Sequence, residues 1–519
     1  MQIIANTWIG TGTTRKLMIE THGDRIAQMI PENQARLRPD AIVCPPDSLL
    51  IPGLHDAHCH LLLGGFMLME CDFDGVESVE QFTDVLARYI REREIRPGEW
   101  IRGGRFDETR FRVTRHDIDR VCADSPVFIW THDLHSALAN TQALEAARID
   151  QDTNDPPGGR FDRDEQGRLT GMLREPAAHL VEHAIPPPRP EQTRNALLKA
   201  QDHAFSRGIT AVSSSVRRDH LAHYARFAGS AERKIRLNVW PVSENFRFEE
   251  DRFERVNATG YRVGTLKGFV DGALGSRSAA FYEPYDDTPG SSGMLVIEEG
   301  LLAEWIQAAS EEHYQVALHA IGDRACSICL NALKRAGAAA NPAELRPRVE
   351  HVQHLRKSDI PRFAELGVIA SMQPIHSTAD MRFVEPRLGK ERAKSSYALR
   401  SLLDWGARLA FGSDWPVEDM NPVAGIAAAV TRQDANGNPP GGWQPQERIR
   451  ADQALRAYTL GSAFAAFWEK DGGTIEEGKF ADFTVLSRNV LTCKPEHIRE
   501  TKALMTIVGG EIVFRDPDF

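Results

Sequence analysis

The sequence has no apolar run long enough to cross a lipid bilayer, which takes about 20 residues. Its amino-terminal segment also lacks the basic head, apolar stretch and small-residue cleavage site of a secretory signal. Only 7 of the 519 residues are cysteine, and an odd number scattered along the chain does not resemble a disulfide framework. We therefore expect a cytoplasmic protein with no membrane partner.

An excess of basic charge is also missing. The 62 Lys and Arg residues are outnumbered by 73 Asp and Glu residues, which gives a formal net charge of −11. Nucleic-acid binding needs a basic surface, so we expect no nucleic-acid partner. An apolar content of 42% with 26% charged residues is typical of a globular protein, and the length favours more than one domain.

The two cysteines of Cys326-x-x-Cys329 are spaced like a metal or redox motif. No second CxxC accompanies them, and the surrounding RACSICLNALKRAG has a helical pattern. We interpret them as buried apolar side chains.

One local pattern occurs three times in the middle of the chain. An amphipathic helix ends at a glycine, and a short apolar strand follows. The glycines are Gly208, Gly367 and Gly406, and the strands are predicted at Thr210–Val212, Val368–Ala370 and Leu409–Phe411. Alternating helices and apolar strands predict either a (β/α)₈ barrel or a doubly wound sheet.

The residues at the ends of the predicted strands favour the barrel. Nearly every strand ends in a polar or titratable residue, and a barrel brings all carboxyl-terminal strand ends to one face. A doubly wound sheet gathers fewer of them at its crevice. These strand-end residues are His58, Lys267, His319, His351 and Asp414.

The two ends of the chain have a different pattern of short β-like runs separated by turn signals. We predict that residues 1–52 and 466–519 pair into one small β-sandwich domain, and that residues 53–465 form the barrel. Residues 70–190 are interpreted as an insertion after the first barrel strand that covers the active site. This insertion opens with a predicted helix that has Ser78 and Gln81 as a capping box.

The His58-Cys59-His60 motif ends an apolar run. Residues two apart on a strand point to the same side, so both imidazoles can reach one metal ion. His319, His351 and Asp414 end other predicted strands, and several metal-competent side chains on one face favour a metal site over separate structural histidines. His354 is an alternative to His351.

Lys267 lies inside the apolar segment LKGFV, where an unpaired ammonium group is costly to bury. The sequence leaves three interpretations open. Lys267 could pair with Asp271, extend to the surface, or be carbamylated by CO₂ to give an anionic ligand that bridges two cations.

Seven segments, in their order along the chain, resemble the amidohydrolase superfamily: PGLHDAHCH, LKGFVDGALGSRSAA, ALHAIGDRA, RVEHVQH, SMQPIH, FGSDWPV and GTIEEGKFADFTVL. The resemblance is to the amidohydrolase family 3 branch, which contains N-substituted formamide deformylase and related metal-dependent hydrolases. It spans essentially the whole chain and implies a metal-bearing (β/α)₈ barrel with a small β-sandwich built from both termini.

The same resemblance implies a set of ligands. His58 and His60 would bind one divalent ion, His319 and His351 a second, and Lys267 would bridge them as a carbamate. Asp414 would bind metal and transfer protons. One or two ions per subunit are expected, with zinc as the expected metal. Arg277, His376 and His135 are candidates for substrate binding, although Arg277 could equally form a structural ion pair and His376 could be an ordinary loop residue.

These features predict a hydrolase that cleaves a non-peptide C–N bond, in an amide or an N-substituted formamide, by attack of metal-activated hydroxide. The alternatives are a deaminase acting on a ring C=N bond and a non-catalytic binding or regulatory protein of the same fold. The expected partner is a small amide-type substrate. Relatives of this size often form homodimers, and the oligomeric state stays open.

Overall fold

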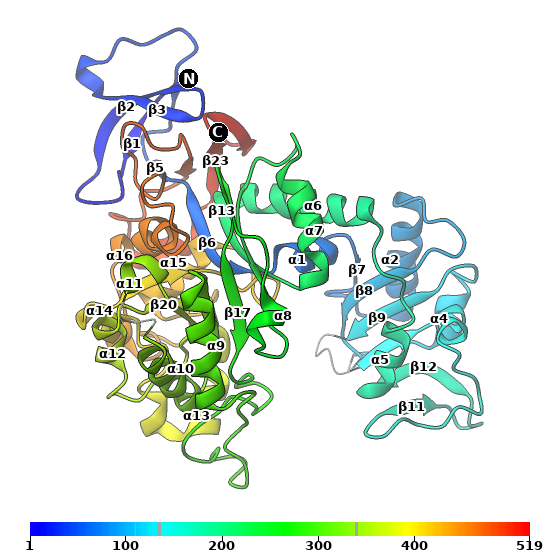
Figure 1. Cartoon of the computed structure of the whole chain (residues 1–519). Helices are drawn as coiled ribbons and strands as arrows, with labels where there is room; N and C mark the ends of the chain where they lie inside the picture. Colours follow the sequence, from blue (N-terminus) through cyan, green and yellow to red (C-terminus); the bar gives the residue numbers. More distant parts are fainter. Residues whose placement is uncertain (109, 132–135, 338–340) are drawn as a thin grey trace. The chain divides into compact units, whose positions relative to one another are not determined.

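The computed structural model describes residues 1–108, 110–131, 136–337 and 341–519. The chain divides into two compact units (Figure 1). Unit 1 comprises Met1–Leu62 and Ala200–Phe519, and unit 2 comprises Leu63–Lys199.

The two ends of the chain contribute strands to one eight-stranded sheet in unit 1 (Figure 1). Its order is β24-β23-β22-β5-β1-β2-β3, with β4 paired to β1. The antiparallel pairing of β5 with β22 joins the two ends, and apolar side chains such as Ile19 and Phe483 are fully buried. A sandwich needs a second packed sheet, so the predicted β-sandwich and its boundaries stay predictions. The strands are β1 (Gln2–Thr7), β2 (Arg15–His22), β3 (Arg25–Pro31), β4 (Ile42–Val43), β5 (Leu49–Pro52), β22 (Phe483–Leu486), β23 (Ala503–Val508) and β24 (Glu511–Arg515).

The rest of unit 1 contains two five-stranded sheets, of order β15-β16-β14-β13-β6 and β17-β18-β19-β20-β21. Their pairings are parallel except between β15 and β16, and most strand residues are buried, as expected for sheets covered on both faces. The strands are β6 (Leu54–Cys59), β13 (Ile209–Val216), β14 (Arg236–Pro241), β15 (Val256–Ala258), β16 (Tyr261–Val263), β17 (Thr265–Phe269), β18 (Gln315–Ala320), β19 (Arg348–His351), β20 (Ile369–Met372) and β21 (Arg408–Phe411).

Helices alternate with these strands along the chain. They are α7 (Leu221–Ala228), α8 (Phe248–Asp251), α9 (Glu299–Glu311), α10 (Asp323–Arg335), α11 (Pro342–Leu345), α12 (Ile360–Glu365), α13 (Pro374–Ala393), α14 (Leu399–Asp404), α15 (Pro422–Thr431), α16 (Ala451–Arg456) and α17 (Ser462–Ala465). Two further helices, α1 (Leu61–Met67) and α6 (Pro190–Ser206), cross the boundaries between the units.

The three predicted helix–glycine–strand units are confirmed. Gly208, Gly367 and Gly406 have φ values of 82°, 63° and 83°, a backbone conformation that favours glycine. Strands β13, β20 and β21 overlap the three predicted strands.

Backbone hydrogen bonds also connect the two parallel sheets to each other. The amide of Ser243 donates to the carbonyl of Lys267 at 2.8 Å, next to a parallel bridge between Val242 and Lys267. Between the other two edges of these sheets, where the segment after β21 meets β6, the amide of Asp414 donates to the carbonyl of His58 at 2.7 Å. The mixed α/β architecture is therefore clear, whereas a closed eight-stranded barrel stays a prediction.

Unit 2 is built on a six-stranded sheet of order β11-β12-β10-β9-β8-β7. The predicted helix is α2 (Val79–Glu92), and Ser78 caps it by accepting a hydrogen bond from the amide of Gln81 at 3.2 Å. The role of this region as a cover for the active site stays a prediction. Its other elements are β7 (Cys71–Asp72), β8 (Ile101–Phe106), α3 (Arg115–Asp119), β9 (Val127–Thr131), β10 (Ser136–Ala139), α4 (Thr141–Ala146), β11 (Arg160–Arg163), β12 (Leu169–Arg174) and α5 (Pro176–Glu182).

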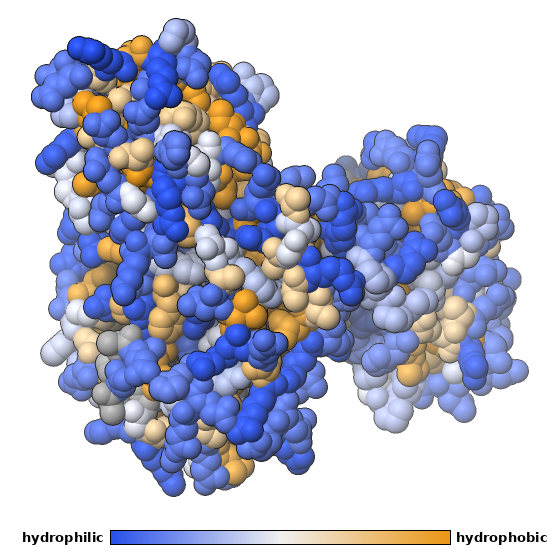
Figure 2. Space-filling model, turned by 45° about the horizontal axis from the view of Figure 1, so that its top comes forward, coloured by the Kyte–Doolittle hydropathy of each residue, from blue (hydrophilic) through white to orange (hydrophobic). Residues whose placement is uncertain are grey.

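Hydrophilic side chains cover most of the surface visible in Figure 2, and apolar ones form smaller groups. The exposed large apolar residues include Val43, Trp405 and Val417. Among the described residues, no helix combines the length and apolarity that a membrane span requires.

Gly412 provides a test of the contact between the end of β21 and β6. A Cβ atom at this position would lie 2.4 Å from the backbone nitrogen of His58. We expect Gly412→Ala to lower the free energy of unfolding by about 1–3 kcal/mol, since added volume in a packed site forces backbone shifts. Gly290→Ala is the control, because its Cβ would have no atom of a described residue within 4 Å. Urea denaturation of both variants measures the difference, and equal stability would contradict this packing.

Candidate metal centre

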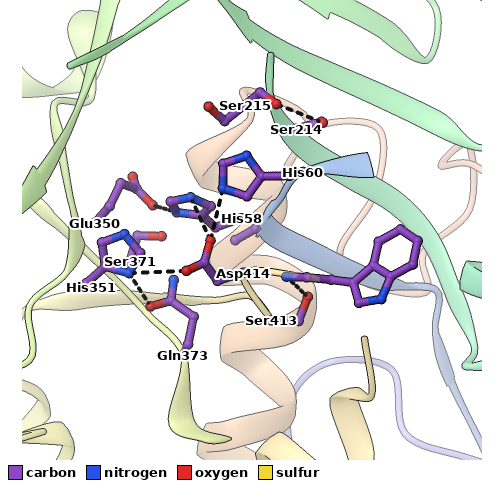
Figure 3. Close-up of polar contacts among 12 residues, drawn as sticks. His58, His60, Ser214, Ser215, Glu350, His351, Ser371, Gln373, Ser413 and Asp414 are labelled. Carbon is purple, nitrogen blue, oxygen red and sulfur yellow. Dashed lines mark hydrogen bonds and ion pairs between the residues drawn. The ribbon is translucent and has the colours of Figure 1, made fainter. Parts of the chain in front are cut away.

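The candidate ligands lie at the carboxyl ends of the parallel strands. His58 is the penultimate residue of β6, His60 follows that strand, and His351 is the last residue of β19. His319 lies near the end of β18, and Asp414 follows β21. The pattern of strand-end residues thus puts side chains that are far apart in the sequence into one cluster (Figure 3).

The Asp414 carboxylate lies at the centre of this cluster (Figure 3). One oxygen, Oδ1, is 3.2 Å from His60 Nε2 and 3.5 Å from His58 Nε2. The other, Oδ2, is 4.0 Å from His351 Nδ1. Burial alone would raise the pKa of Asp414, but the hydrogen bond from His60 and the rings of His58 and His351 hold it well below its usual value.

The backbone at the cluster adopts a rare conformation. His351, Val352 and Asp414 have φ values of 76°, 49° and 60°, although none is glycine. Such conformations cost free energy and persist where the surrounding structure holds them, typically at functional sites.

His58 is oriented by a buried carboxylate. Its Nδ1 lies 2.7 Å from Glu350 Oε2, and Glu350 is fully buried beside the equally buried guanidinium of Arg348. Burial raises the pKa of Glu350, but the larger opposing effect of Arg348 and His58 brings it below its usual value. The carboxylate is therefore ionised. Burial also lowers the pKa of His58 to about 4, so the ring is neutral at pH 7. A neutral ring that donates from Nδ1 keeps a lone pair on Nε2, which is the arrangement of a metal-binding histidine.

Glu350 was not among the residues predicted from the sequence. A usable signal was present, because Arg348 and Glu350 are two charged residues on one side of a strand predicted to be buried, directly before the ligand candidate His351.

Lys267 and His319 complete the cluster. The His319 and His351 rings have centroids 4.5 Å apart, and His58 and His351 are 4.9 Å apart. Lys267 is fully buried, and its Nζ has no hydrogen-bond partner within the described ranges. Burial lowers the pKa of Lys267 to about 8, against the opposing effect of the Glu350 and Asp414 carboxylates.

Neither of the two simpler interpretations of Lys267, extension to the surface or pairing with Asp271, fits its surroundings. A fully buried side chain does not extend to the surface. Asp271 accepts hydrogen bonds from the amides of Ala280, Ile321 and Gly322 at 2.9, 3.0 and 2.8 Å, so the backbone occupies its oxygens. Carbamylation of Lys267 stays a prediction.

Within the described residues, two groups of side chains have the geometry of a cation site. The ligand atoms of His58, His60 and Asp414 lie within 4.8 Å of one another, as do those of His351, His376 and Asp414. Imidazole nitrogens and carboxylate oxygens are the donors that zinc and similar divalent ions take in proteins. Lys267 Nζ, which is buried and has no hydrogen-bond partner in the described part of the chain, also fits a site that needs a further ligand. These residues fit a divalent ion.

The other candidates have different surroundings. His354 Nδ1 is bonded to Ser396 Oγ at 2.8 Å and its ring packs near Phe281, so His351 rather than His354 lies in the cluster. Arg277 pairs with Asp287 at 2.8 Å. Cys326 and Cys329 are fully buried, as predicted. His135 lies outside the described residues, and the roles of Arg277 and His135 stay predictions.

The family model of the Amidohydrolase family matches residues 47–514. The chain belongs to the amidohydrolase family. It is 35% identical to the protein LONG AFTER FAR-RED 3 of Arabidopsis thaliana, over 90% of this chain and 82% of that protein. It is 28% identical to the N-substituted formamide deformylase of Arthrobacter pascens, over 94% of this chain and 93% of the enzyme.

A solved structure shows the same architecture. An uncharacterized metal-dependent hydrolase from Pyrococcus furiosus superposes with a TM-score of 0.78 at 29% identity, covering 95% of this chain and 100% of that one. The resemblance drawn from the sequence motifs is confirmed, and the chain is a metal-dependent hydrolase of the amidohydrolase family.

Glu350→Gln tests the orientation of His58. The neutral amide keeps the size of the side chain but removes the charge that holds the Nδ1 proton. We expect metal affinity to fall about 10- to 100-fold, since partners that orient ligating histidines have effects of this size. Competition with a chelator measures the affinity. The exposed residue Glu365 supplies the control Glu365→Gln, and thermal unfolding of both variants separates lost affinity from lost stability. Unchanged metal affinity in Glu350→Gln would contradict this role.

Proposed function

We propose that the protein hydrolyses a non-peptide C–N bond in a small amide or N-substituted formamide. The observation that carries this proposal is the cluster of His58, His60 and His351 around the buried Asp414 carboxylate. The formamide deformylase of Arthrobacter pascens aligns over nearly its whole length, which supports the bond class.

For the fold, we propose that the two parallel sheets close into one (β/α)₈ barrel. β16 ends at Val263 and β17 begins at Thr265, so they are consecutive parts of one extended segment. With β6, β13, β14 and β18 to β21, this segment would make eight parallel strands. The hydrogen bonds from Ser243 to Lys267 and from Asp414 to His58 support closure at both junctions.

His58, His60 and Asp414 would hold one divalent ion, zinc in our proposal. His319, His351 and Lys267 would hold a second. In this arrangement the neutral Lys267 amine forms a bond to the carbon of CO₂ and releases one proton, which leaves a carbamate. The lowered pKa of Lys267, to about 8, supports this reaction because it leaves part of the amine unprotonated near neutral pH.

A divalent ion bound at this position lowers the pKa of water towards about 7 and polarises a carbonyl group. The Asp414 carboxylate would accept the proton of the attacking water and return it to the leaving nitrogen. His376 would contact the substrate from the edge of the cluster, where one of its ring nitrogens lies within 4.8 Å of ligand atoms of His351 and Asp414. We also retain Arg277 and His135 as proposed substrate contacts.

Asp414→Asn tests the proton transfer. We expect kcat to fall about 10²- to 10⁴-fold, the usual contribution of a general acid–base group. The assay is a panel of N-substituted formamides, N-acyl amino acids and cyclic amides, with the released amine measured. Asp404→Asn changes an exposed carboxylate on α14 and is the matched control. Near-normal turnover by Asp414→Asn would overturn the assignment, and ammonia released from a ring substrate would instead indicate a deaminase.

Removal of the metal tests the cofactor. Dialysis against a chelator should abolish turnover, because the histidines alone do not lower the pKa of water. Added zinc or manganese should restore it, with metal content measured by mass spectrometry. Full activity of metal-free protein would rule out the metal-dependent mechanism.

A further inference from the structure

Two glutamine–histidine pairs cross between the neighbouring parallel strands β19 and β20. Strand β19 ends at His351, with Gln353 two residues later, and β20 is followed by Gln373 and then His376. Each histidine bonds to the glutamine that follows the other strand. Gln373 contacts His351, and Gln353 contacts His376. The two imidazole rings lie nearly parallel, at 6° and with centroids 6.3 Å apart.

The two amides make opposite contacts. His351 Nδ1 lies 2.9 Å from the carbonyl oxygen of Gln373, which can only accept a hydrogen bond (Figure 3). His351 therefore carries its proton on Nδ1 and keeps a lone pair on Nε2. His376 Nδ1 lies 3.3 Å from the amide nitrogen of Gln353, which can only donate. A neutral His376 therefore accepts at Nδ1 and carries its proton on Nε2.

The Nε2–H group of His376 is buried and available. The residue is 6% exposed, and its Nε2 has no hydrogen-bond partner among the residues that the structure describes. A buried donor without a partner costs free energy, so such a group suggests a ligand that satisfies it. With Nδ1 occupied by Gln353 and a proton on Nε2, neither nitrogen of this ring offers a lone pair to a metal ion.

We propose that His376 is a hydrogen-bond donor to the substrate rather than a third metal ligand, and that Gln353 is the positioning residue that fixes its tautomer. This inference rests on the proposed hydrolysis, which supplies the acceptor: the amide carbonyl oxygen, whose negative charge grows as the carbonyl is attacked. A preorganised donor at that point stabilises the developing charge. The crossed pairs thus give two similar histidines opposite roles.

Nitrogen NMR of the metal-loaded protein tests the tautomer directly. The protein is labelled with ¹⁵N-histidine, and the signals of His376 are assigned from the spectrum of His376→Gln. We expect the proton on Nε2 and none on Nδ1. A proton on Nδ1, or loss of the Nε2 proton when zinc is added, would overturn the proposal because Nε2 would then be available as a ligand.

Gln353→Met tests the positioning role, since methionine keeps the length of the side chain but removes the amide. We expect kcat to fall about tenfold, a typical effect of losing an orienting partner. Metal content should be unchanged, and the His376 spectrum should show a mixture of tautomers. Gln373→Met is the matched comparison on the other pair, and there we expect metal affinity to fall because His351 loses its orienting contact.

The outcomes are separable. Loss of metal by Gln353→Met to the same extent as by Gln373→Met would overturn the proposal, and so would wild-type kcat and an unchanged His376 spectrum in Gln353→Met. If the wild-type protein hydrolyses no amide in the panel, the proposed function fails. The tautomer and the metal contents of the two variants still decide whether His376 is a donor or a ligand.

Discussion

Two backbone hydrogen bonds join the segment after β21 to β6, from the amide of Asp414 to His58 and from the amide of His60 to Trp415, each at 2.7 Å. They form only because glycine at position 412 lets the two backbones approach, since a Cβ there would overlap His58. The bonds hold the Asp414 carboxylate beside both imidazoles although the residues are more than 350 positions apart in the chain. These two hydrogen bonds therefore fix the position of the Asp414 carboxylate, which the imidazoles of His58, His60 and His351 surround.

Burying a charged side chain costs free energy, and at this centre the groups beside the buried Glu350 carboxylate offset that cost. Glu350 and Arg348 are both fully buried, and they form an ion pair in which each partly neutralises the charge of the other. Removing one partner of such a pair typically costs about 3–5 kcal/mol, so the pair is retained once it is in place. The pair also has a chemical consequence, because the carboxylate selects the proton position on His58 and leaves Nε2 directed at Asp414. The same group therefore contributes both to the packing of the strands and to the proton position on His58.

Much of this centre could be predicted from the sequence, because a ligand-type residue at the end of an apolar strand is a local pattern. His58, His60, His351 and Asp414 were all found in this way. The contacts that orient them could not be predicted, since Glu350 meets His58 across 292 residues and Gln353 meets His376 across a strand pair. For Arg277 the sequence left a substrate contact and a structural ion pair open. In the structure it pairs with Asp287 ten residues away, and its role as a substrate contact stays a prediction. Local patterns predict strand ends, and register between strands determines which side chains meet there.

The crossed pairs after β19 and β20 show why register matters for function. His351 ends β19 and Gln353 follows it, whereas Gln373 follows β20 and His376 lies in the first turn of α13. The parallel alignment of β19 and β20, with Arg348 beside Ile369, brings each glutamine to the histidine that belongs to the other strand end. A shift of one residue in this pairing would change which of these side chains lie opposite each other at the strand ends. A glutamine can accept or donate at its end, so the same residue type can leave either a lone pair or a proton on the far nitrogen of its histidine. In our proposal, the register of a single strand pair thereby separates metal binding at His351 from substrate binding at His376.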